Sequence, residues 1–145
     1  MKFLEALEAQ VRGELPPPPI AKTIGMRLVH VEPGKSVFEL DADIERHGNP
    51  MGTLHGGVLC DVADGALGVA FASMLEEGET FTTLELKINF LRPFWSGLLT
   101  ATGRIVHRGK TIGMTECEIA DIEGRLIAKA TSTCMVLRDD KARGR

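Results

Sequence analysis

Apolar residues near the start of the chain follow the spacing of one helix face. Glutamates stand between them, and the apolar positions are Phe3, Leu4, Leu7 and Val11. This pattern predicts a short amphipathic helix over residues 2–13 that lies on a larger body. The run from Pro16 to Pro19 cannot continue a helix and favours an extended connector. Residues 1–19 are therefore expected to form a helix and a connector ahead of the main domain.

Two apolar-rich runs then predict a β-hairpin. They extend from Ile24 to Val31 and from Ser36 to Asp41. The segment Glu32-Pro33-Gly34-Lys35 between them places proline and glycine where the chain must reverse. Residues 44–54, which follow, are rich in glycine, asparagine and proline and show no periodicity, so they are expected to form a loop.

The segment from about His55 to Leu75 is apolar on nearly all sides and rich in alanine and glycine. It predicts a buried helix of roughly 20 residues, roughly 30 Å long. Its small side chains allow a sheet to approach closely. Two acids, Asp61 and Asp64, interrupt the apolar run and argue against a membrane span.

After this helix, apolar residues recur at every second position, which predicts a half-buried strand that ends before Pro93. Its apolar positions are Leu84, Leu86, Ile88 and Phe90. Three more strands are expected at residues 96–106, 111–122 and 126–137, separated by glycine-containing turns. Four successive strands with short connections predict an antiparallel meander.

These elements predict a domain of the α+β class over residues 20–138. A single antiparallel sheet of about six strands, with the long helix against one face, would satisfy the rule that each apolar face packs on another layer. The charged residues 139–145 are expected to form a disordered tail.

Composition supports one domain and narrows the classes of function. A chain of 145 residues with 43% hydrophobic residues can bury one sizeable core. A net charge of −3 without a lysine or arginine block argues against a nucleic-acid surface. The absence of a long apolar run at the N-terminus predicts a cytoplasmic protein that does not enter a membrane. Cys60, Cys117 and Cys134 lack CxxC spacing, so neither a disulfide framework nor a metal site is expected.

The junction of loop and long helix is the first candidate for chemistry. At His55-Gly56-Gly57 the first backbone N–H groups of the helix are unpaired and the helix dipole is positive, which suits an oxyanion. Two glycines let a carbonyl group approach these donors closely. Asn49 offers an amide that could polarise the same carbonyl, and His55 could orient the loop or act as a base. The plain alternative is an ordinary loop-to-helix junction.

Asp64 is the second candidate, because a carboxylate among apolar helix residues costs several kcal/mol if it is buried without partners. It should therefore face a cavity or an interface. Gly57 and Asp64 are separated by two helix turns, roughly 10 Å, so one carbonyl cannot contact both. If both act on one bond, Gly57 of one chain must meet Asp64 of another across a twofold axis. This spacing predicts a homodimer.

Asn49, His55-Gly56-Gly57 and Asp64, at spacings of six and nine, resemble the motif of the PaaI-type branch of hotdog-fold acyl-CoA thioesterases. The segment TTLELKINFLRPFWSG is similar to the strand of that family that ends in Arg-Pro. The resemblance covers roughly residues 20–138. It implies an antiparallel sheet wrapped around a central helix, an acyl-CoA substrate of small, medium or aromatic acyl group, and no cofactor besides the substrate's own coenzyme A.

The resemblance also implies roles for individual residues. The Gly57 N–H would bind the oxyanion, assisted by Asn49 and by the loop around His55. Asp64 of the neighbouring chain would be the nucleophile or the general base that activates water. The Thr83 hydroxyl would hold that water.

The resemblance also implies contacts to the substrate and an assembly larger than a dimer. Gly56 and Thr82 stand beside the catalytic positions, and Arg92, Arg108 and Lys110 are the basic residues nearest the strand ends, where they could bind coenzyme A phosphates. Solvated charges at turns are the plain alternative for these three. The family also suggests that the dimers pair into a homotetramer.

Three other functions compete with hydrolysis of acyl-CoA. A non-catalytic acyl-CoA-binding hotdog module would need no acid facing the thioester. A hotdog hydratase or dehydratase pairs a histidine with an acid at a spacing that this chain lacks. A serine or cysteine hydrolase is disfavoured because Ser73 and Cys60 lack a GxSxG-like turn.

Overall fold

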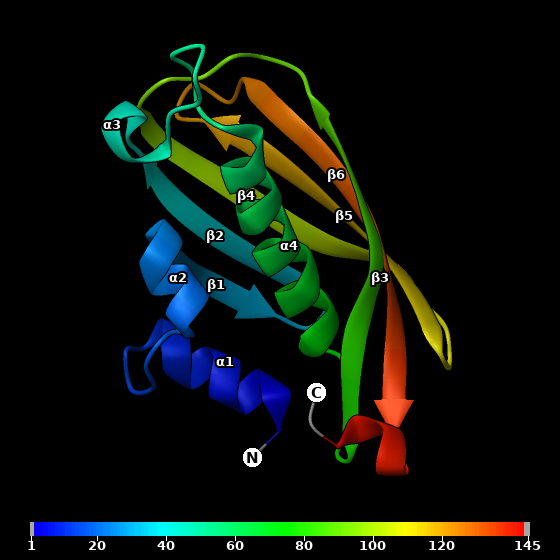
Figure 1. The fold of residues 1–145 in the computed structure, drawn as a ribbon. Helices are drawn as coiled ribbons and strands as arrows, with labels where there is room; N and C mark the ends of the chain where they lie inside the picture. The colour runs from blue at the N-terminus through cyan, green and yellow to red at the C-terminus, as the bar shows by residue number, and fades with distance from the viewer. Residues whose placement is uncertain (1, 144–145) are drawn as a thin grey trace.

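Six strands form one antiparallel sheet in the computed structural model, which describes residues 2–143. The strands are β1 Met26–Glu32, β2 Lys35–Ala42, β3 Glu79–Phe90, β4 Gly97–Arg108, β5 Ile112–Asp121 and β6 Leu126–Arg138. The sheet curls around one long helix, α4, which extends over Gly56–Ala72 and lies on the concave face (Figure 1). The predicted α+β fold, with about six strands around a central helix, is therefore confirmed.

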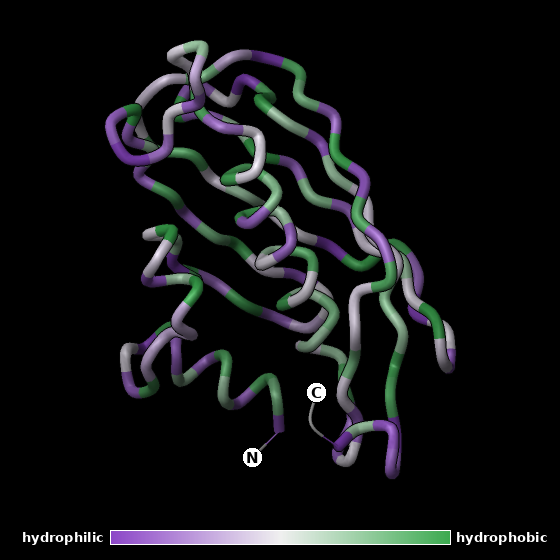
Figure 2. The backbone as a smooth tube through the Cα atoms, viewed as in Figure 1, coloured by the Kyte–Doolittle hydropathy of each residue, from purple (hydrophilic) through white to green (hydrophobic). Residues whose placement is uncertain are grey.

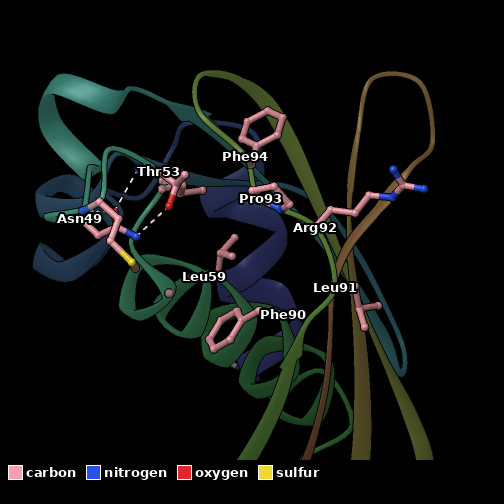
Figure 3. A pocket seen from close by; sticks show the side chains of 11 residues that line it. Asn49, Thr53, Leu59, Phe90, Leu91, Arg92, Pro93 and Phe94 are labelled. Atoms are coloured by element: carbon pink, nitrogen blue, oxygen red, sulfur yellow. Dashed lines mark hydrogen bonds between the residues drawn. The ribbon is translucent and has the colours of Figure 1, made fainter.

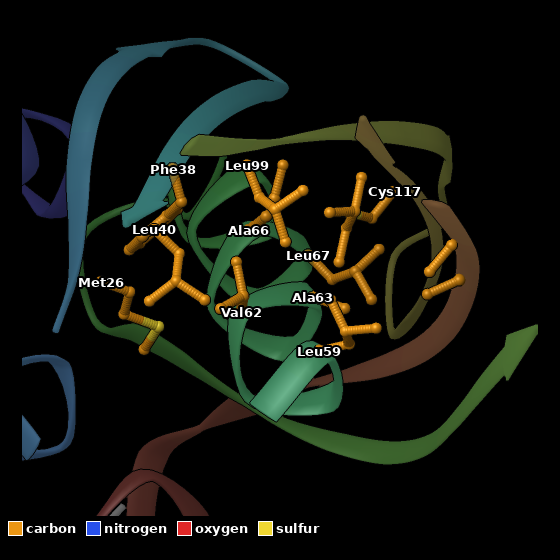
Figure 4. Close-up of a cluster of buried hydrophobic side chains, with 14 of the residues drawn as sticks. Met26, Phe38, Leu40, Leu59, Val62, Ala63, Ala66, Leu67, Leu99 and Cys117 are labelled. Carbon is orange, nitrogen blue, oxygen red and sulfur yellow. The ribbon is translucent and has the colours of Figure 1, made fainter. Parts of the chain in front are cut away.

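The core lies between α4 and the concave face of the sheet. Small and branched apolar residues of the helix meet apolar residues of the strands there (Figure 4). Fully buried members include Leu40, Val62, Ala66, Leu67 and Leu99. Because alanine occupies much of the buried face of α4, the helix backbone can approach the sheet closely, as the composition of this segment predicts.

The order of the strands differs from the predicted meander. β4, β5 and β6 are consecutive neighbours, but the order is β1-β2-β4-β5-β6-β3, so β3 pairs with β6 instead of β4. The connection from β3 to β4 contains Pro93 and runs past the loop before α4, where Leu54 N–H donates to the Phe94 carbonyl at 2.8 Å. Periodicity reports which face of a strand is buried and carries no information on its partner, and a proline-containing connection is poorly suited to a tight hairpin.

Three short helices lie where no helix was predicted. α2 Pro19–Ile24 replaces the end of the expected connector and the first residue of the expected strand. Its signal was present, since Pro19 stands at the favoured first position and Gly25 ends it with φ of 85°. α3 Ile44–His47 lies in the expected loop, capped by Asp43, whose side chain accepts from Glu45 N–H.

The third short helix corrects the prediction for the C-terminal tail. Residues Asp139–Ala142 form a 3-10 helix, η1, where disorder was expected. The last two residues of the predicted tail, 144–145, lie outside the described residues.

The predicted N-terminal amphipathic helix is confirmed as α1 Phe3–Val11. Its residues Leu4, Leu7 and Val11 pack against the core, and the chain there changes repeatedly between hydrophilic and hydrophobic residues (Figure 2). α1 lies beside the β1 edge of the sheet (Figure 1). Within residues 2–143, no helix is long and apolar enough to cross a membrane.

A β-bulge breaks the alternation predicted for β3. Thr83 pairs with Cys134 and Glu85 pairs with Thr133, so Leu84 is an extra residue in the ladder. Leu84 is 51% exposed, although the regular period of two would bury it with Leu86 and Ile88. Leu84 is exposed because it is the extra residue of the bulge, and the bulge also changes which residues face the core on its two sides.

Gly103 marks a close approach of the sheet to the backbone of α4. A Cβ at this position would lie 2.3 Å from the Ala66 carbonyl oxygen of α4. The neighbouring Ser36 hydroxyl donates to that same oxygen at 2.7 Å, and Ser36 is the cross-strand partner of Gly103. We expect Gly103→Ala to lower the free energy of unfolding by about 3 kcal/mol, because backbone must move to accept the methyl group. Urea denaturation measures the change.

Gly65→Ala is the matched control for this substitution. The added Cβ at Gly65 would lie 3.4 Å from the flexible end of Met26 and 3.6 Å from the Phe38 ring, both at ordinary contact distance. Alanine is favoured over glycine inside a helix by about 0.5–1 kcal/mol, so this variant should be as stable as the parent or slightly more stable. Equal destabilisation of both variants would contradict the proposed close packing at Gly103.

Candidate active site

The start of α4 is capped by its own preceding histidine. His55 is the N-cap residue, and its Nδ1 accepts a hydrogen bond from Gly57 N–H at 2.8 Å. A Cβ on Gly57 would lie 2.7 Å from this Nδ1, so only glycine fits here without a shift of the His55 ring. The Gly57 N–H therefore already has a partner inside the chain. The prediction that Gly57 presents the unpaired oxyanion donor is corrected, since the spacing of the motif does not reveal which N–H group the histidine takes.

The Gly56 N–H is the donor that the helix start leaves open. It has no hydrogen-bond partner among the described residues, whereas the next two N–H groups donate to Nδ1 and to the carbonyl of His55. The first N–H groups of a helix carry its positive dipole end. Gly56 was predicted as a substrate contact, and the structure makes it the better candidate for the oxyanion donor.

Gly56 borders a largely apolar pocket of about 380 Å³ (Figure 3). The loop before α4, the first turns of the helix and the end of β3 build its wall, with the lining residues Asn49, Met51, Thr53, Leu54, Gly56, Leu59, Phe90, Leu91, Arg92, Pro93 and Phe94. A Cβ at Gly56 would lie 2.9 Å from the Phe90 ring. Glycine is therefore required for the ring to cover this part of the helix start.

Asn49 holds the loop beside this pocket. Its side-chain oxygen accepts from the N–H groups of Met51 and Thr53, both at 3.0 Å, and its Nδ2 donates to the Thr53 hydroxyl at 2.8 Å. The second N–H of this amide has no partner among residues 2–143. The main role of the Asn49 side chain is thus to hold the loop in shape. It can in addition offer one amide N–H to the pocket.

Asp64 lies on the face of α4 that meets β3. On that face Gly68 and Phe71 contact Phe81, whose ring centroid is 5.4 Å from that of Phe71. Thr83, two residues further along β3, lies close enough to Asp64 for its hydroxyl to lower the pKa of that carboxyl. Thr82 lies between two residues that face the helix, so alternation turns it to the opposite face of the sheet. The structure therefore brings Asp64 and Thr83 together and turns Thr82 away.

Three effects set the pKa of Asp64. Although its side chain is exposed in the single chain, nearby protein atoms exclude part of the water around the carboxylate. This desolvation is the largest effect and raises the pKa above the ordinary value, the Thr83 hydroxyl lowers it, and the charge of Asp61 raises it again. The net direction is upward. A partly desolvated carboxylate holds its proton more readily and is a stronger base when it is ionised.

A single chain does not bring Gly56 and Asp64 to one reacting group. They are eight residues apart on the same helix, which corresponds to about 12 Å along its axis. β3 is an edge strand of the sheet, and its exposed apolar residues include Leu84 and Phe90, at 51% and 54%. A long edge strand with apolar side chains is a template for pairing with another chain.

The three predicted phosphate contacts lie in two different places. Arg92 is exposed at the end of β3 on the pocket wall, and its guanidinium extends away from Asn49 and Thr53 (Figure 3). Arg108 is paired with Glu79 at 3.1 Å and lies over the Phe71 ring at 5.3 Å, near the other end of α4. Lys110 is exposed in the turn that follows.

Glu79 compensates the charge of Arg108 and so argues against that residue as a phosphate contact. Its side chain is only 8% exposed and also pairs with Arg138 at 2.6 Å. Desolvation opposes ionisation of Glu79, but hydrogen bonds from the Glu76 backbone and Arg138, with the charges of both arginines, bring its pKa below the ordinary value. Arg108 therefore belongs to a structural ion pair, and Arg92 and Lys110 stay predictions.

Comparisons with known proteins agree with this geometry. A family model described as the thioesterase superfamily matches residues 51–128. The 1,4-dihydroxy-2-naphthoyl-CoA hydrolase of Listeria monocytogenes is 34% identical over 122 residues, which cover 84% of this chain and 98% of that protein. The acyl-coenzyme A thioesterase PaaI of Escherichia coli is 30% identical over 109 residues, covering 74% and 75% of the two chains.

A solved structure shows the same similarity in three dimensions. A thioesterase family protein from Silicibacter pomeroyi superposes with a TM-score of 0.81 at 29% identity, covering 92% of this chain and 99% of that one. The matched family region, residues 51–128, contains Gly56, Asp64 and Thr83.

Proposed function

The chain belongs to the thioesterase superfamily and is a thioester hydrolase, and on this premise we propose that it hydrolyses acyl-CoA with a site shared between two subunits. Gly56 of one subunit binds the thioester oxygen, and Asp64 of the partner subunit drives the hydrolysis. The observation that carries the proposal is the unpaired Gly56 N–H at the positive end of α4, which opens on an apolar pocket. No cofactor takes part.

The proposed reaction uses two features of this chain. As negative charge develops on the thioester oxygen, the Gly56 N–H and the dipole of α4 stabilise it. As a general base, Asp64 takes a proton from water while the water oxygen bonds to the carbonyl carbon, and collapse of the intermediate breaks the C–S bond and releases coenzyme A. As a nucleophile, Asp64 bonds to the carbonyl carbon, the C–S bond breaks and coenzyme A leaves as the thiolate, and water then hydrolyses the resulting mixed anhydride to the free acid and the Asp64 carboxylate. Thr83 orients the carboxylate in either route.

The acyl group is proposed to occupy the pocket beside Gly56. Its apolar walls include the side chains of Leu59, Phe90 and Phe94, and a volume of about 380 Å³ suits a small, medium or aromatic acyl group. The names of the two relatives, a dihydroxynaphthoyl-CoA hydrolase and PaaI, support an aromatic substrate. A homodimer is the proposed catalytic unit, and pairing of dimers into a tetramer is proposed by analogy with the family.

Release of free thiol from a panel of acyl-CoA thioesters tests this function. The panel compares acetyl, hexanoyl, dodecanoyl, benzoyl and phenylacetyl groups at equal concentration. We expect the highest kcat/KM for groups that fit the pocket, with aromatic thioesters above acetyl-CoA. Binding of these compounds without thiol release would contradict the proposal and favour a module that only binds acyl-CoA.

The pH dependence of the reaction should report the environment of Asp64. Because the ionised carboxylate is the active form, activity falls as the pH falls through the pKa of Asp64, which lies above the ordinary aspartate value of about 3.9. Thr83→Val removes the hydroxyl that lowers this pKa, so the fall of kcat/KM on the acid side should move to higher pH. Asp61→Asn removes a neighbouring negative charge, so this fall should move to lower pH. Shifts in the same direction for both variants would contradict this assignment.

A further inference from the structure

The facing of residues along β3 changes at the bulge. Before it, Phe81 and Thr83 face α4, since Phe81 contacts Gly68 and Phe71 and Thr83 reaches Asp64. Beyond it, the even-numbered positions face inward: Leu86 and Ile88 pack on the core and Phe90 lies against Gly56. A strand without an extra residue cannot face the helix with both sets. The bulge at Leu84 therefore turns Thr83 toward Asp64 while Phe90 still reaches the helix start.

Ser132 of β6 holds this bulge from the neighbouring strand. Its hydroxyl donates to the Glu85 carbonyl at 2.9 Å, directly after the extra residue. Ser132 is only 2% exposed, and the hydrogen bond that it donates is partly buried. Bulges disturb the regular ladder locally, and a carbonyl displaced from the ladder needs another donor. A serine hydroxyl supplies one without adding bulk beneath the site.

We propose that Ser132 is a positioning residue for hydrolysis, because its hydroxyl fixes the bulge that presents Thr83 to Asp64. Ser132 acts through β3 and touches neither substrate nor the Asp64 carboxylate. This role rests on the proposed function of Asp64, whereas the geometric step, from Ser132 to the bulge to Thr83, can be tested without any turnover. Loss of the hydroxyl leaves the Glu85 carbonyl without its buried donor and loosens the register at Thr83.

The test measures kcat and the titration of Asp64 in Ser132→Ala. We expect kcat to fall about 10- to 100-fold, because small errors in placing a reacting group are costly. The carboxyl ¹³C signal of Asp64 should titrate at higher pH than in the parent, as it should in Thr83→Val. The titratable groups near Asp64 are Asp61, Cys60 and Cys134, and of these the Ser132 hydroxyl contacts only the Cys134 thiol, at 3.8 Å. Burial raises the pKa of Cys134, and loss of the Ser132 hydroxyl raises it further, so this thiol stays uncharged while Asp64 titrates.

The double variant separates positioning from a general loss of packing. In the Thr83→Val background, Ser132→Ala should change neither the titration of Asp64 nor kcat further, because the group that Ser132 positions is already absent. Full additivity of the two substitutions would overturn the proposal. Ser132→Cys is slightly larger and keeps a weaker donor, so its effect should be intermediate, and it replaces Ser132→Ala in the test if that variant is too unstable to measure.

Thr133→Ala is the matched control. The Thr133 hydroxyl also binds Glu85, but it donates to the side-chain oxygen at 2.9 Å on the opposite face of the sheet. This variant should leave kcat and the titration of Asp64 unchanged, and effects equal to those of Ser132→Ala would overturn the proposal. If Asp64→Asn remained active, the function proposed for Asp64 would fail, while an unchanged titration in Ser132→Ala would show that the positioning step itself had failed.

Discussion

Replacement of Asp64 by asparagine is expected to reduce kcat for acyl-CoA hydrolysis by about 10²- to 10⁴-fold, the usual range for removal of a positioned acid or base. Asparagine keeps the size of the side chain and can still accept a hydrogen bond from Thr83, so the helix and its contact with β3 should persist. Only the negative charge and the basic oxygen are lost. Thiol release under saturating substrate measures kcat, and circular dichroism with sedimentation checks the fold and the assembly.

Asp61→Asn is the control for this loss. Asp61 lies on the same helix three residues earlier and acts on Asp64 through its charge. Its replacement should change kcat less than about tenfold at neutral pH, since it contributes no reacting atom in the proposed mechanism. If the two variants lost activity equally, the loss would reflect the general charge of the helix surface, and the role of Asp64 would have to be abandoned.

Removal of the Gly56 N–H is expected to have the next largest effect. Gly56→Pro deletes this donor at the first position of α4, where proline is well tolerated. The preceding residue, His55, has φ of −65° and ψ of 131°, a conformation that suits a residue before proline. Relative to Gly56→Ala, kcat should fall about 10²- to 10³-fold, as for loss of one oxyanion donor.

Gly56→Ala is the necessary comparison because both variants add a Cβ. That atom would lie 2.9 Å from the Phe90 ring in either case, so both variants must displace the ring. Only proline removes the N–H. If alanine and proline gave equal kcat values, the Gly56 N–H would not be the oxyanion donor, and the steric change alone would explain the loss.

Mixing the two inactive variants tests the shared site directly. When Asp64→Asn and Gly56→Pro chains exchange freely, half of the dimers are mixed and each mixed dimer holds one intact site. Activity should return to about a quarter of the parent value. If both groups acted within one subunit, every site would carry one defect and mixing would restore nothing.

The hydrophobic pattern was sufficient to predict the elements that form the core. A period of two in the strands and an alanine-rich apolar run in α4 predict a sheet with a buried helix, because burial dictates which positions must be apolar. The pairing of β3 with β6 was missed, since alternation is the same for either partner. The residue types around Asp64 also identified the candidate acid, because a carboxylate in an apolar helix needs a special environment.

The choice between the two glycine N–H groups at the start of α4 depended on the tertiary structure. The sequence shows two adjacent glycines after His55, and either N–H could serve as the donor. The capping bond from Gly57 N–H to His55 Nδ1 leaves Gly56 as the proposed donor, and that bond depends on side-chain geometry. The structural role of Arg108 also became clear only from the tertiary structure, because its buried partner Glu79 lies 29 residues away along the chain.

The amino-acid sequence by itself determined the α+β fold class, the buried helix and the motif of the thioesterase superfamily, and it predicted a site shared between two chains. These depend on local burial and on distances along one helix, both of which follow from residue spacing. Only the tertiary structure decided which N–H is unpaired, which threonine faces Asp64 and which strand lies beside β3. These depend on a capping hydrogen bond, a one-residue bulge and strand pairing. Each of the three is set by contacts that do not change the hydrophobic periodicity of the sequence.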